Sequence, residues 1–259
     1  MVKLNLNDQI VKIDEGELVG YSVDGQEYIH QKGSPGWRNS DTEMFPIIGP
    51  TNEADFKVTT PRGTAVQDQH GLLREMVYQL VSKTDTKATF KKQYISGTPM
   101  KNSKFPEKSR EEFLSWPYSF EFVKSFEIFE NGLRIQFKIT GEEGMPFMLG
   151  YHPAFKLNSE TAFIKTPDGT IALQEVLNAG SRALPVMDCN SLTLRDVGEL
   201  SLRTEGFGSF MLWTEVPNMI CIEPISFYPY AVGQKDLHHG FRAMNGSERI
   251  FSITIQPNI

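Results

Sequence analysis

The chain has 259 residues, of which 39% are hydrophobic and 11% aromatic, and its formal net charge at pH 7 is -6. A chain of this length and composition can bury one large core, so we expect a single domain that spans residues 1–259. The negative net charge, with lysines and arginines scattered along the chain, argues against binding to a nucleic acid backbone.

The cysteines and the N-terminus bear on the cellular compartment. Cys189 and Cys221 are the only cysteines and form no CxxC pair, so the sequence suggests neither a disulfide framework nor a thiolate zinc site. The N-terminal stretch is too polar for the apolar core of a signal peptide, and no run approaches the ~20 apolar residues of a membrane span. We therefore expect a soluble, cytoplasmic protein that does not contact membranes.

The first third of the chain predicts short strands and one long loop. Extended segments are expected at residues 4–6, 18–23 and 27–30, with Asp24-Gly25 as a hairpin turn between the last two. Residues 31–56 are rich in Gly, Pro, Ser and Asn, which predicts a long loop that carries Trp37 and Arg38. After it, His70 precedes Gly71 in a predicted bend, and Arg74 precedes an alternating segment over residues 76–81.

Two strands in the middle of the chain give the clearest local pattern. Residues 120–130 and 133–140 each alternate apolar and polar side chains, and Asn131-Gly132 lies between them. That dipeptide favours a two-residue type I′ turn. We expect the hairpin to pair Ile128 with Ile135 and Phe126 with Phe137 on one buried face.

The segment that follows this hairpin contains a histidine whose backbone is restricted on both sides. Gly150 permits a close approach of another chain segment, and Pro153 pushes His152 into the extended region. The imidazole can therefore be held in one direction, as a functional site requires. The alternative is a structural histidine whose ring nitrogens bond to backbone carbonyls.

The last third predicts further strands and one buried carboxylate. Short extended pieces are expected at residues 191–194 and 200–202, two strands on either side of Pro217-Asn218, and a final strand over residues 249–256. Glu223 is the only charged residue in an apolar run, and we expect Pro224 to end that strand. Burial would raise the pKa of Glu223, although an ion-paired structural role is the alternative.

No metal or phosphate-binding motif is present. His238 and His239 are neighbours, and on an extended chain their side chains would point to opposite faces and could not share an ion. Glycine-rich phosphate loops are missing as well. We therefore expect no metal and no cofactor.

Four motifs occur in a fixed order: FPIIG at residues 45–49, HGLLRE at 70–75, GYHPAF at 150–155 and CIEPIS at 221–226. Together they resemble the aldose 1-epimerase (mutarotase) family, in particular its bacterial LacX-related and hexose-6-phosphate mutarotase-related branch. The resemblance implies an all-β, mainly antiparallel fold, a galactose-mutarotase-like β-supersandwich. It also implies an isomerase that needs no cofactor and binds a sugar.

The same resemblance implies roles for individual residues. Glu223 would be the general base at the C1 hydroxyl and His152 the general acid at the ring oxygen. His70, Arg74 and, less directly, Arg38 would contact the substrate. The branch often has an aromatic residue where this chain has Leu72, and its sugar-binding aspartate has two candidates by order only, at residues 168 and 188, neither of which can be assigned.

Several alternatives stay open at this point. His70 could be a turn histidine, and Arg74 could pair with Glu75. The protein could be a non-catalytic sugar-binding or sensing module on the same fold, or another isomerase or lyase with the same acid and base. The substrate could be a free or a phosphorylated aldose. We expect a free aldose, because a phosphate needs two or more converging cations and Arg38 and Arg74 are the only candidates associated with the motifs. The assembly could be a monomer or a homodimer.

Overall fold

The computed structural model describes residues 1–37 and 41–258, and most of their regular structure is β-strand. Every pairing between two described strands is antiparallel. The all-β, mainly antiparallel architecture expected from the sequence is therefore confirmed.

The largest element is a nine-stranded sheet. Its strands, in spatial order, are β18 (Gly169–Ala172), β17 (Phe163–Thr166), β20 (Ser191–Arg195), β21 (Glu199–Glu205), β25 (Glu248–Asn258), β13 (Gly132–Gly141), β12 (Phe120–Phe129), β9 (Lys87–Tyr94) and β8 (Gln79–Lys83). The long strands in its centre alternate buried and solvent-facing residues, so one face of the sheet covers the core.

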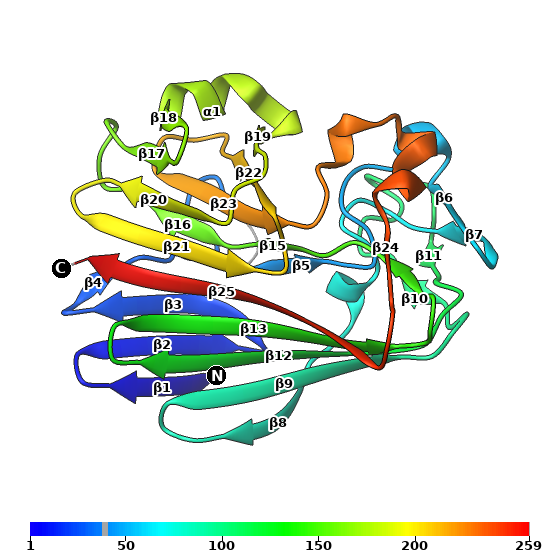
Figure 1. Ribbon diagram of the computed structural model, residues 1–259, viewed down its shortest axis with the longest axis horizontal. Coiled ribbons are helices and arrows are strands. Elements are labelled where there is room, and N and C mark those ends of the chain that lie inside the picture. Colours follow the sequence, from blue (N-terminus) through cyan, green and yellow to red (C-terminus); the bar gives the residue numbers. More distant parts are fainter. Residues whose placement is uncertain (38–40, 259) are drawn as a thin grey trace.

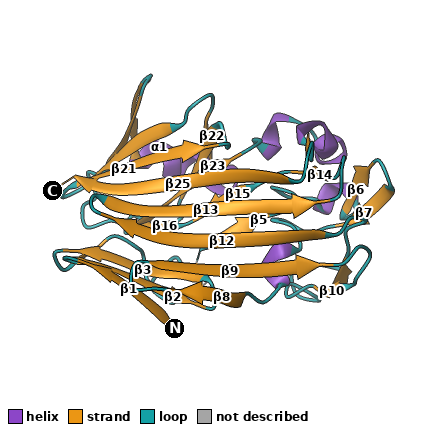
Figure 2. Cartoon of the chain, turned by 60° about the horizontal axis from the view of Figure 1, so that its bottom comes forward, coloured by secondary structure: helices purple, strands orange, loops and turns teal. Residues whose placement is uncertain are grey.

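A six-stranded sheet forms the second layer. It contains β19 (Leu184–Val186), β22 (Ser209–Trp213), β23 (Met219–Ile225), β15 (Gly150–His152) and β5 (Thr42–Met44), and β16 (Ala154–Lys156) also pairs with β23. Figure 1 shows these strands along one side of the nine-stranded sheet, and Figure 2 shows them behind it. The core lies between the two sheets, and all seven residues of β23 are buried.

The remaining elements are small. A four-stranded sheet contains β1 (Val2–Leu6), β2 (Gln9–Asp14), β3 (Glu17–Val23) and β4 (Gln26–Glu27). Two-stranded pairs are formed by β6 (Lys57–Thr60) with β7 (Gly63–Val66), β10 (Met100–Lys101) with β11 (Phe113–Leu114), and β14 (Pro146–Phe147) with β24 (Arg242–Ala243). The helical segments are α1 (Leu173–Ala179), η1 (Asn52–Ala54), η2 (Leu73–Glu75), η3 (Gly180–Arg182), η4 (Pro229–Ala231) and η5 (Gln234–Gly240). None of these helices has the length and apolar character that a membrane crossing requires.

The central hairpin forms as predicted, but its register is shifted. β12 and β13 bury the expected face, yet Phe126 pairs with Ile135 and Ile128 with Leu133. The two loop residues are Glu130 and Asn131, because Phe129 already pairs with Gly132. The expected pairs were therefore wrong by two residues, since Gly132 begins the second strand instead of completing the turn.

Other expectations need correction at their boundaries. The predicted loop over residues 31–56 contains β5, a short strand that is paired to β15. β23 runs through Pro224 to Ile225, because Pro224 pairs with Phe210 in the sheet and does not end the strand. His238 and His239 lie in the 3-10 helix η5 with ring centroids 4.3 Å apart, and not on an extended chain. The sequence did not predict β2, β9 or α1.

A buried charged cluster joins the two layers. Lys124 of β12 is fully buried, and its Nζ lies 2.7 Å from Asp41 Oδ2 and 2.6 Å from Glu43 Oε1. The hydroxyl of Tyr151 also donates to Asp41. Burial alone would lower the pKa of Lys124, but the two carboxylates raise it above the usual value. The ammonium therefore stays charged and holds β5 and β15 against β12.

Candidate active site

Strand register brings His152 and Glu223 together. β15 pairs Gly150 with Ile225, and β16 pairs Ala154 with Cys221. The same register brings Glu223 opposite His152, where Pro153 interrupts the ladder between β15 and β16. The distance between His152 Nε2 and Glu223 Oε1 is 3.4 Å, with 12% of the histidine side chain and 2% of the glutamate side chain exposed.

Gly150 lies close to the strands on both sides of it. A Cβ atom at that position would lie 2.4 Å from Cε of Met44 in β5 and 3.4 Å from Cγ2 of Ile225 in β23. A larger residue would displace the flexible end of the Met44 side chain, whereas its distance from Ile225 would be an ordinary van der Waals contact. The expectation that Gly150 allows close approach is confirmed, and the approaching segments are the strands on both sides of β15.

His70 reaches the same site from a strained loop. His70 and Gly71 both have φ of 73°, in the left-handed region. A Cβ atom at residue 71 would lie 2.3 Å from the carbonyl oxygen of Phe45, so glycine is needed there. The backbone NH of Phe45 donates to the carbonyl of His70 at 3.1 Å, and that of Leu73 donates to the carbonyl of Phe45 at 3.1 Å. The 45–49 and 70–75 motifs therefore fix each other.

Aromatic rings surround the imidazole of His152. The ring centroid of Trp37 lies 5.3 Å away, that of His70 5.6 Å and that of Trp213 5.9 Å. Nδ1 of His152 is buried, and it has no hydrogen-bond partner among the residues described. The expected structural alternative, with ring nitrogens bonded to backbone carbonyls, is therefore not what these residues show. Packing and the contact with Glu223 orient the ring.

Burial shifts the pKa values of the three titratable groups in directions that keep each neutral. It raises the pKa of Glu223 well above the usual value and lowers that of His152 to about 4. For His70, burial lowers the pKa well below 6.5, and the charge of Arg74 lowers it further, as does His152 when it is protonated. Burial therefore favours the uncharged form of each group, which is the protonated carboxyl for Glu223 and the neutral imidazole for His152 and His70.

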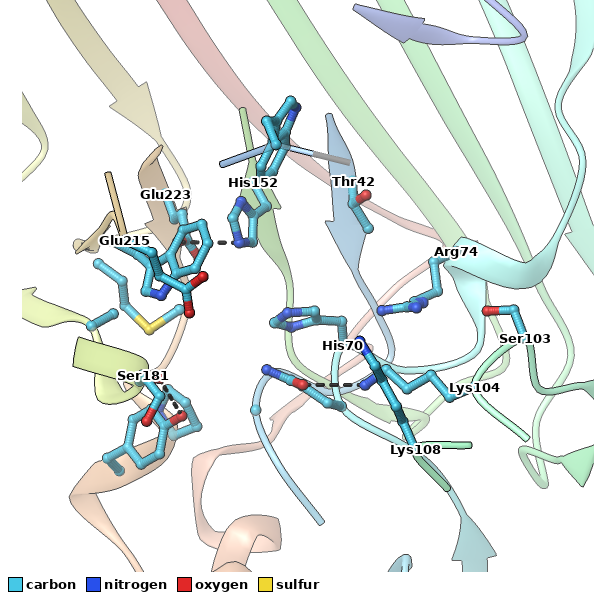
Figure 3. A pocket seen from close by; sticks show the side chains of 18 of the residues that line it. Thr42, His70, Arg74, Ser103, Lys104, Lys108, His152, Ser181, Glu215 and Glu223 are labelled. Carbon is cyan, nitrogen blue, oxygen red and sulfur yellow. Dashed lines mark hydrogen bonds and ion pairs between the residues drawn. The ribbon is translucent and has the colours of Figure 1, made fainter. Parts of the chain in front are cut away.

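These residues line one cavity with a volume of about 650 Å³. Figure 3 shows Glu223, His152 and Glu215 on one side of it, His70 in the centre, and Arg74, Ser103, Lys104 and Lys108 on the other side. Its volume lies in the range typical of small-molecule sites. Among the described residues, no three His, Cys, Asp or Glu side chains group closely enough to hold a metal ion.

Four of the five predicted site residues converge on this cavity. His70, Arg74, His152 and Glu223 all line it, whereas Arg38 lies outside the described residues. Arg74 also pairs with Glu75, its Nε lying 3.2 Å from the carboxylate. The alternative interpretation of Arg74 as an ion-pair partner is therefore confirmed together with its place in the cavity.

The sequence did not identify several lining residues. Among them are Trp213, Glu215, Lys104 and Lys108. Glu215 is one of five glutamates between His152 and Glu223 in the chain, so its position in the sequence alone could not have singled it out. Residues 168 and 188 do not line the cavity.

Comparisons with solved structures identify the fold. A galactose mutarotase-like protein from Lactobacillus casei is similar with a TM-score of 0.79 and 18% sequence identity, over 100% of both chains. A galactose mutarotase related enzyme from Lactobacillus acidophilus gives a TM-score of 0.80 and 20% identity, over 100% of this chain and 97% of that one. A galactose mutarotase-like protein from Clostridium acetobutylicum gives 0.72 and 12%, over 99% and 94%. The expected galactose-mutarotase-like fold is confirmed.

Sequence comparison identifies the family. No curated protein matches the sequence. The family model for aldose 1-epimerase matches residues 52–207, which is more than half of the chain. That stretch includes the 70–75 and 150–155 motifs and hence His70 and His152. The chain belongs to the aldose 1-epimerase family.

Proposed function

We propose that this protein interconverts the α and β anomers of a hexose by acid–base opening and reclosure of the sugar ring. The observation that carries the proposal is the contact of 3.4 Å between His152 Nε2 and Glu223 Oε1 at the wall of a cavity that also contains His70. An imidazole and a carboxyl group that share one proton can supply both transfers that the reaction needs.

Ring opening uses the form of the pair in which Glu223 is ionised and His152 is protonated. Glu223 accepts the proton of the C1 hydroxyl, the bond between C1 and the ring oxygen breaks, and His152 donates its proton to that oxygen. The product is the open-chain aldehyde, and the pair is then neutral. This neutral form is the one that burial favours in the unliganded site.

Reclosure uses the neutral form. After rotation about the C1–C2 bond, the hydroxyl on C5 attacks the other face of the aldehyde. His152 takes the proton from that hydroxyl, and Glu223 returns its proton to the aldehyde oxygen. Protons balance over the cycle, and no cofactor takes part. In the complex, sugar hydroxyls that donate to Glu223 stabilise its ionised form, which offsets the effect of burial.

Two further residues have proposed binding roles. His70 is neutral because its pKa is low, so one ring nitrogen can donate a hydrogen bond to the sugar near its ring oxygen. Glu215 lines the cavity on the side of Glu223, as Figure 3 shows. We assign it to the sugar hydroxyls, in the role that an aspartate has in relatives.

The test is two-dimensional exchange NMR on equilibrium mixtures of glucose and of galactose. Wild type should strengthen the exchange cross-peaks between anomers, and Glu223→Gln should lower this rate by about 10²- to 10⁴-fold because it removes a general base. Glu160→Gln, an exposed carboxylate elsewhere, is the matched control and should behave as wild type.

Binding measurements separate this proposal from the alternative of a non-catalytic sugar-binding module. Glu223→Gln should retain sugar affinity measured by titration calorimetry. Wild-type exchange no faster than in buffer, with sugar binding intact, would support the binding module instead.

A further inference from the structure

The wall of the cavity opposite Glu223 is cationic. Arg74 comes from η2, and Lys104 and Lys108 come from the segment between β10 and β11. In Figure 3 the three side chains lie on the same side of His70, next to Ser103. This wall carries three cations in a chain whose formal net charge is -6, so its positive charge is local.

The segment that carries the lysines is fixed to the histidine loop. Asn102 is buried, and its Nδ2 donates to Asp68 Oδ2 at 3.0 Å and to the carbonyl of Glu111 at 2.9 Å. The backbone NH of Lys108 donates to the carbonyl of Lys104 at 2.8 Å. The two lysines therefore belong to one tight turn, and Asn102 holds that turn beside the loop of His70.

The carboxylates of Glu75, Asp68 and Glu107 lie near these cations, but they do not accept hydrogen bonds from all of the cations' N–H groups. Arg74 meets Glu75 through Nε only, and Lys104 donates to Asp68 at 3.3 Å and to Gln69 at 3.1 Å. Within the described residues, the two Nη groups of Arg74 and the ammonium of Lys108 have no ion pair or hydrogen bond, although Glu107 also lines the cavity. A guanidinium has five donors and an ammonium three, so most of this donor capacity is unpaired among the described residues.

The positive field reaches the centre of the site. After burial, the causes that lower the pKa of His70 are His152, which is charged only when it is protonated, and the cations Arg74 and Lys104. Burial lowers the pKa of Lys104 as well; the carboxylate of Asp68 offsets part of this shift, and the charge of Arg74 adds to it. An anion placed between these groups would relieve this repulsion.

We propose that the cationic wall of Arg74, Lys104 and Lys108 binds an anionic substituent, a phosphate or a carboxylate, at the end of the sugar farthest from C1. The proposal rests on the proposed function, because it places C1 at Glu223. It also changes the expectation from the sequence, where only Arg38 and Arg74 were motif-associated cations and a free aldose was favoured. Arginine forms paired hydrogen bonds with phosphates and with carboxylates, so the same wall could recognise either substituent.

Exchange NMR with three sugars tests this subsite. Glucose 6-phosphate carries the phosphate, glucuronate carries the carboxylate, and glucose is the neutral reference. We expect kcat/KM for at least one anionic sugar to exceed that for glucose by about tenfold or more, and the better of the two identifies the anion. Kinetics in which glucose equals or exceeds both would overturn the proposal.

Two further measurements connect the preference to the wall. Lys108→Met changes an exposed side chain and should lower the ratio of kcat/KM for the anionic sugar to that for glucose by about fivefold or more. The matched control is Lys101→Met, an exposed lysine that does not line the cavity. In wild type, added sodium chloride should raise KM for the anionic sugar more than KM for glucose. A ratio that neither substitution nor salt changes contradicts the assignment.

Binding to Glu223→Gln separates failure of this inference from failure of the proposed function. If no sugar exchanges faster than in buffer but the variant binds glucose 6-phosphate or glucuronate more tightly than glucose, the anionic subsite is supported and the mutarotase activity is contradicted. If all three sugars exchange equally fast, above the rate in buffer, and bind equally well, the mutarotase activity is supported and the anionic subsite is contradicted.

Discussion

In His152 and Glu223, the proposed acid–base pair, burial determines which of the two groups holds the proton. An exposed imidazole titrates near 6.5 and an exposed glutamate near 4.3, so in water at pH 5.5 the two would be an ion pair. In the cavity the pKa of His152 falls to about 4 and that of Glu223 rises well above its usual value. The order of the two pKa values is reversed, and the proton moves to the carboxyl.

The reversed order predicts the pH dependence of anomer exchange. The active pair holds one proton, so kcat/KM should fall when a second proton binds or when the last one leaves. The second proton enters on His152, whose pKa is about 4, and we therefore expect the acidic limb of the profile near pH 4 instead of 6.5. The basic limb reports Glu223 and should lie well above the usual range for a carboxyl.

The measurement is exchange NMR from pH 3.5 to 9, with the buffer rate subtracted at each pH because acids and bases accelerate spontaneous mutarotation. Retained folding at the acidic end can be followed by circular dichroism. An acidic limb centred between pH 6 and 7 would contradict burial as the dominant influence on His152.

At the scale of elements, the site depends on how β5 and β15 are held against the nine-stranded sheet. Thr42 pairs with His152 across these two strands, and the residues on either side of Thr42, Asp41 and Glu43, both bind Lys124. The buried ammonium of β12 therefore lies directly behind the strand that positions the imidazole.

Replacing this lysine should destabilise the whole protein. Lys124→Met preserves the apolar length of the side chain but leaves buried Asp41 without its cation and Glu43 with only the longer contact to Lys92, at 3.9 Å. Loss of one partner from a buried ion pair typically costs about 3–5 kcal/mol. Urea denaturation measures the change in the free energy of unfolding.

The matched control removes the cation together with one carboxylate. Lys124→Met combined with Asp41→Asn leaves Glu43 paired with the buried Lys92, whose Nζ lies 3.9 Å from its carboxylate, so it should recover most of the lost stability. A single variant that costs less than about 1 kcal/mol would show that the carboxylates find other partners or are already protonated.

At the scale of the whole molecule, the sequence predicts individual strands and candidate residues better than their pairing. The alternation of β12 and β13 reveals their buried face, but not the register, because Asn131-Gly132 can be placed in the turn in more than one way. His152 and Glu223 were each found from their apolar surroundings. The two residues lie opposite each other because β15 and β16 pair with β23. This pairing joins segments far apart in the sequence, and no local sequence pattern predicts it.

Some residues of the core and of the cavity could not be recognised in the sequence because lysines are normally expected at the surface. Lys124 occupies a position of the buried period-2 pattern of β12, but a lysine is normally taken to face solvent. Lys104 and Lys108 belong to a turn-rich segment without a motif. Only the three-dimensional packing of that segment against Asp68 brings them to the cavity.

The buried carboxyl of Glu223 at the candidate active site also affects the stability of the whole protein. In the unfolded chain Glu223 has an ordinary pKa, and in the folded protein burial raises it. A raised folded pKa gives a contribution to stability that is fully present below the unfolded pKa and is lost as pH rises toward the folded pKa. Over that interval the unfolded state releases the proton and the folded state keeps it.

Glu223→Gln should therefore be more thermostable than wild type, and the difference should grow with pH. The amide cannot ionise in either state, so the variant lacks the pH-dependent loss, which amounts to at most about 1.4 kcal/mol per pH unit. His152 remains in both proteins, and its own contribution largely cancels. Scanning calorimetry at pH 5, 6, 7 and 8 measures the difference in Tm, with Glu160→Gln as the exposed control. A difference that stays constant or shrinks as pH rises would mean that Glu223 is ionised in the folded protein.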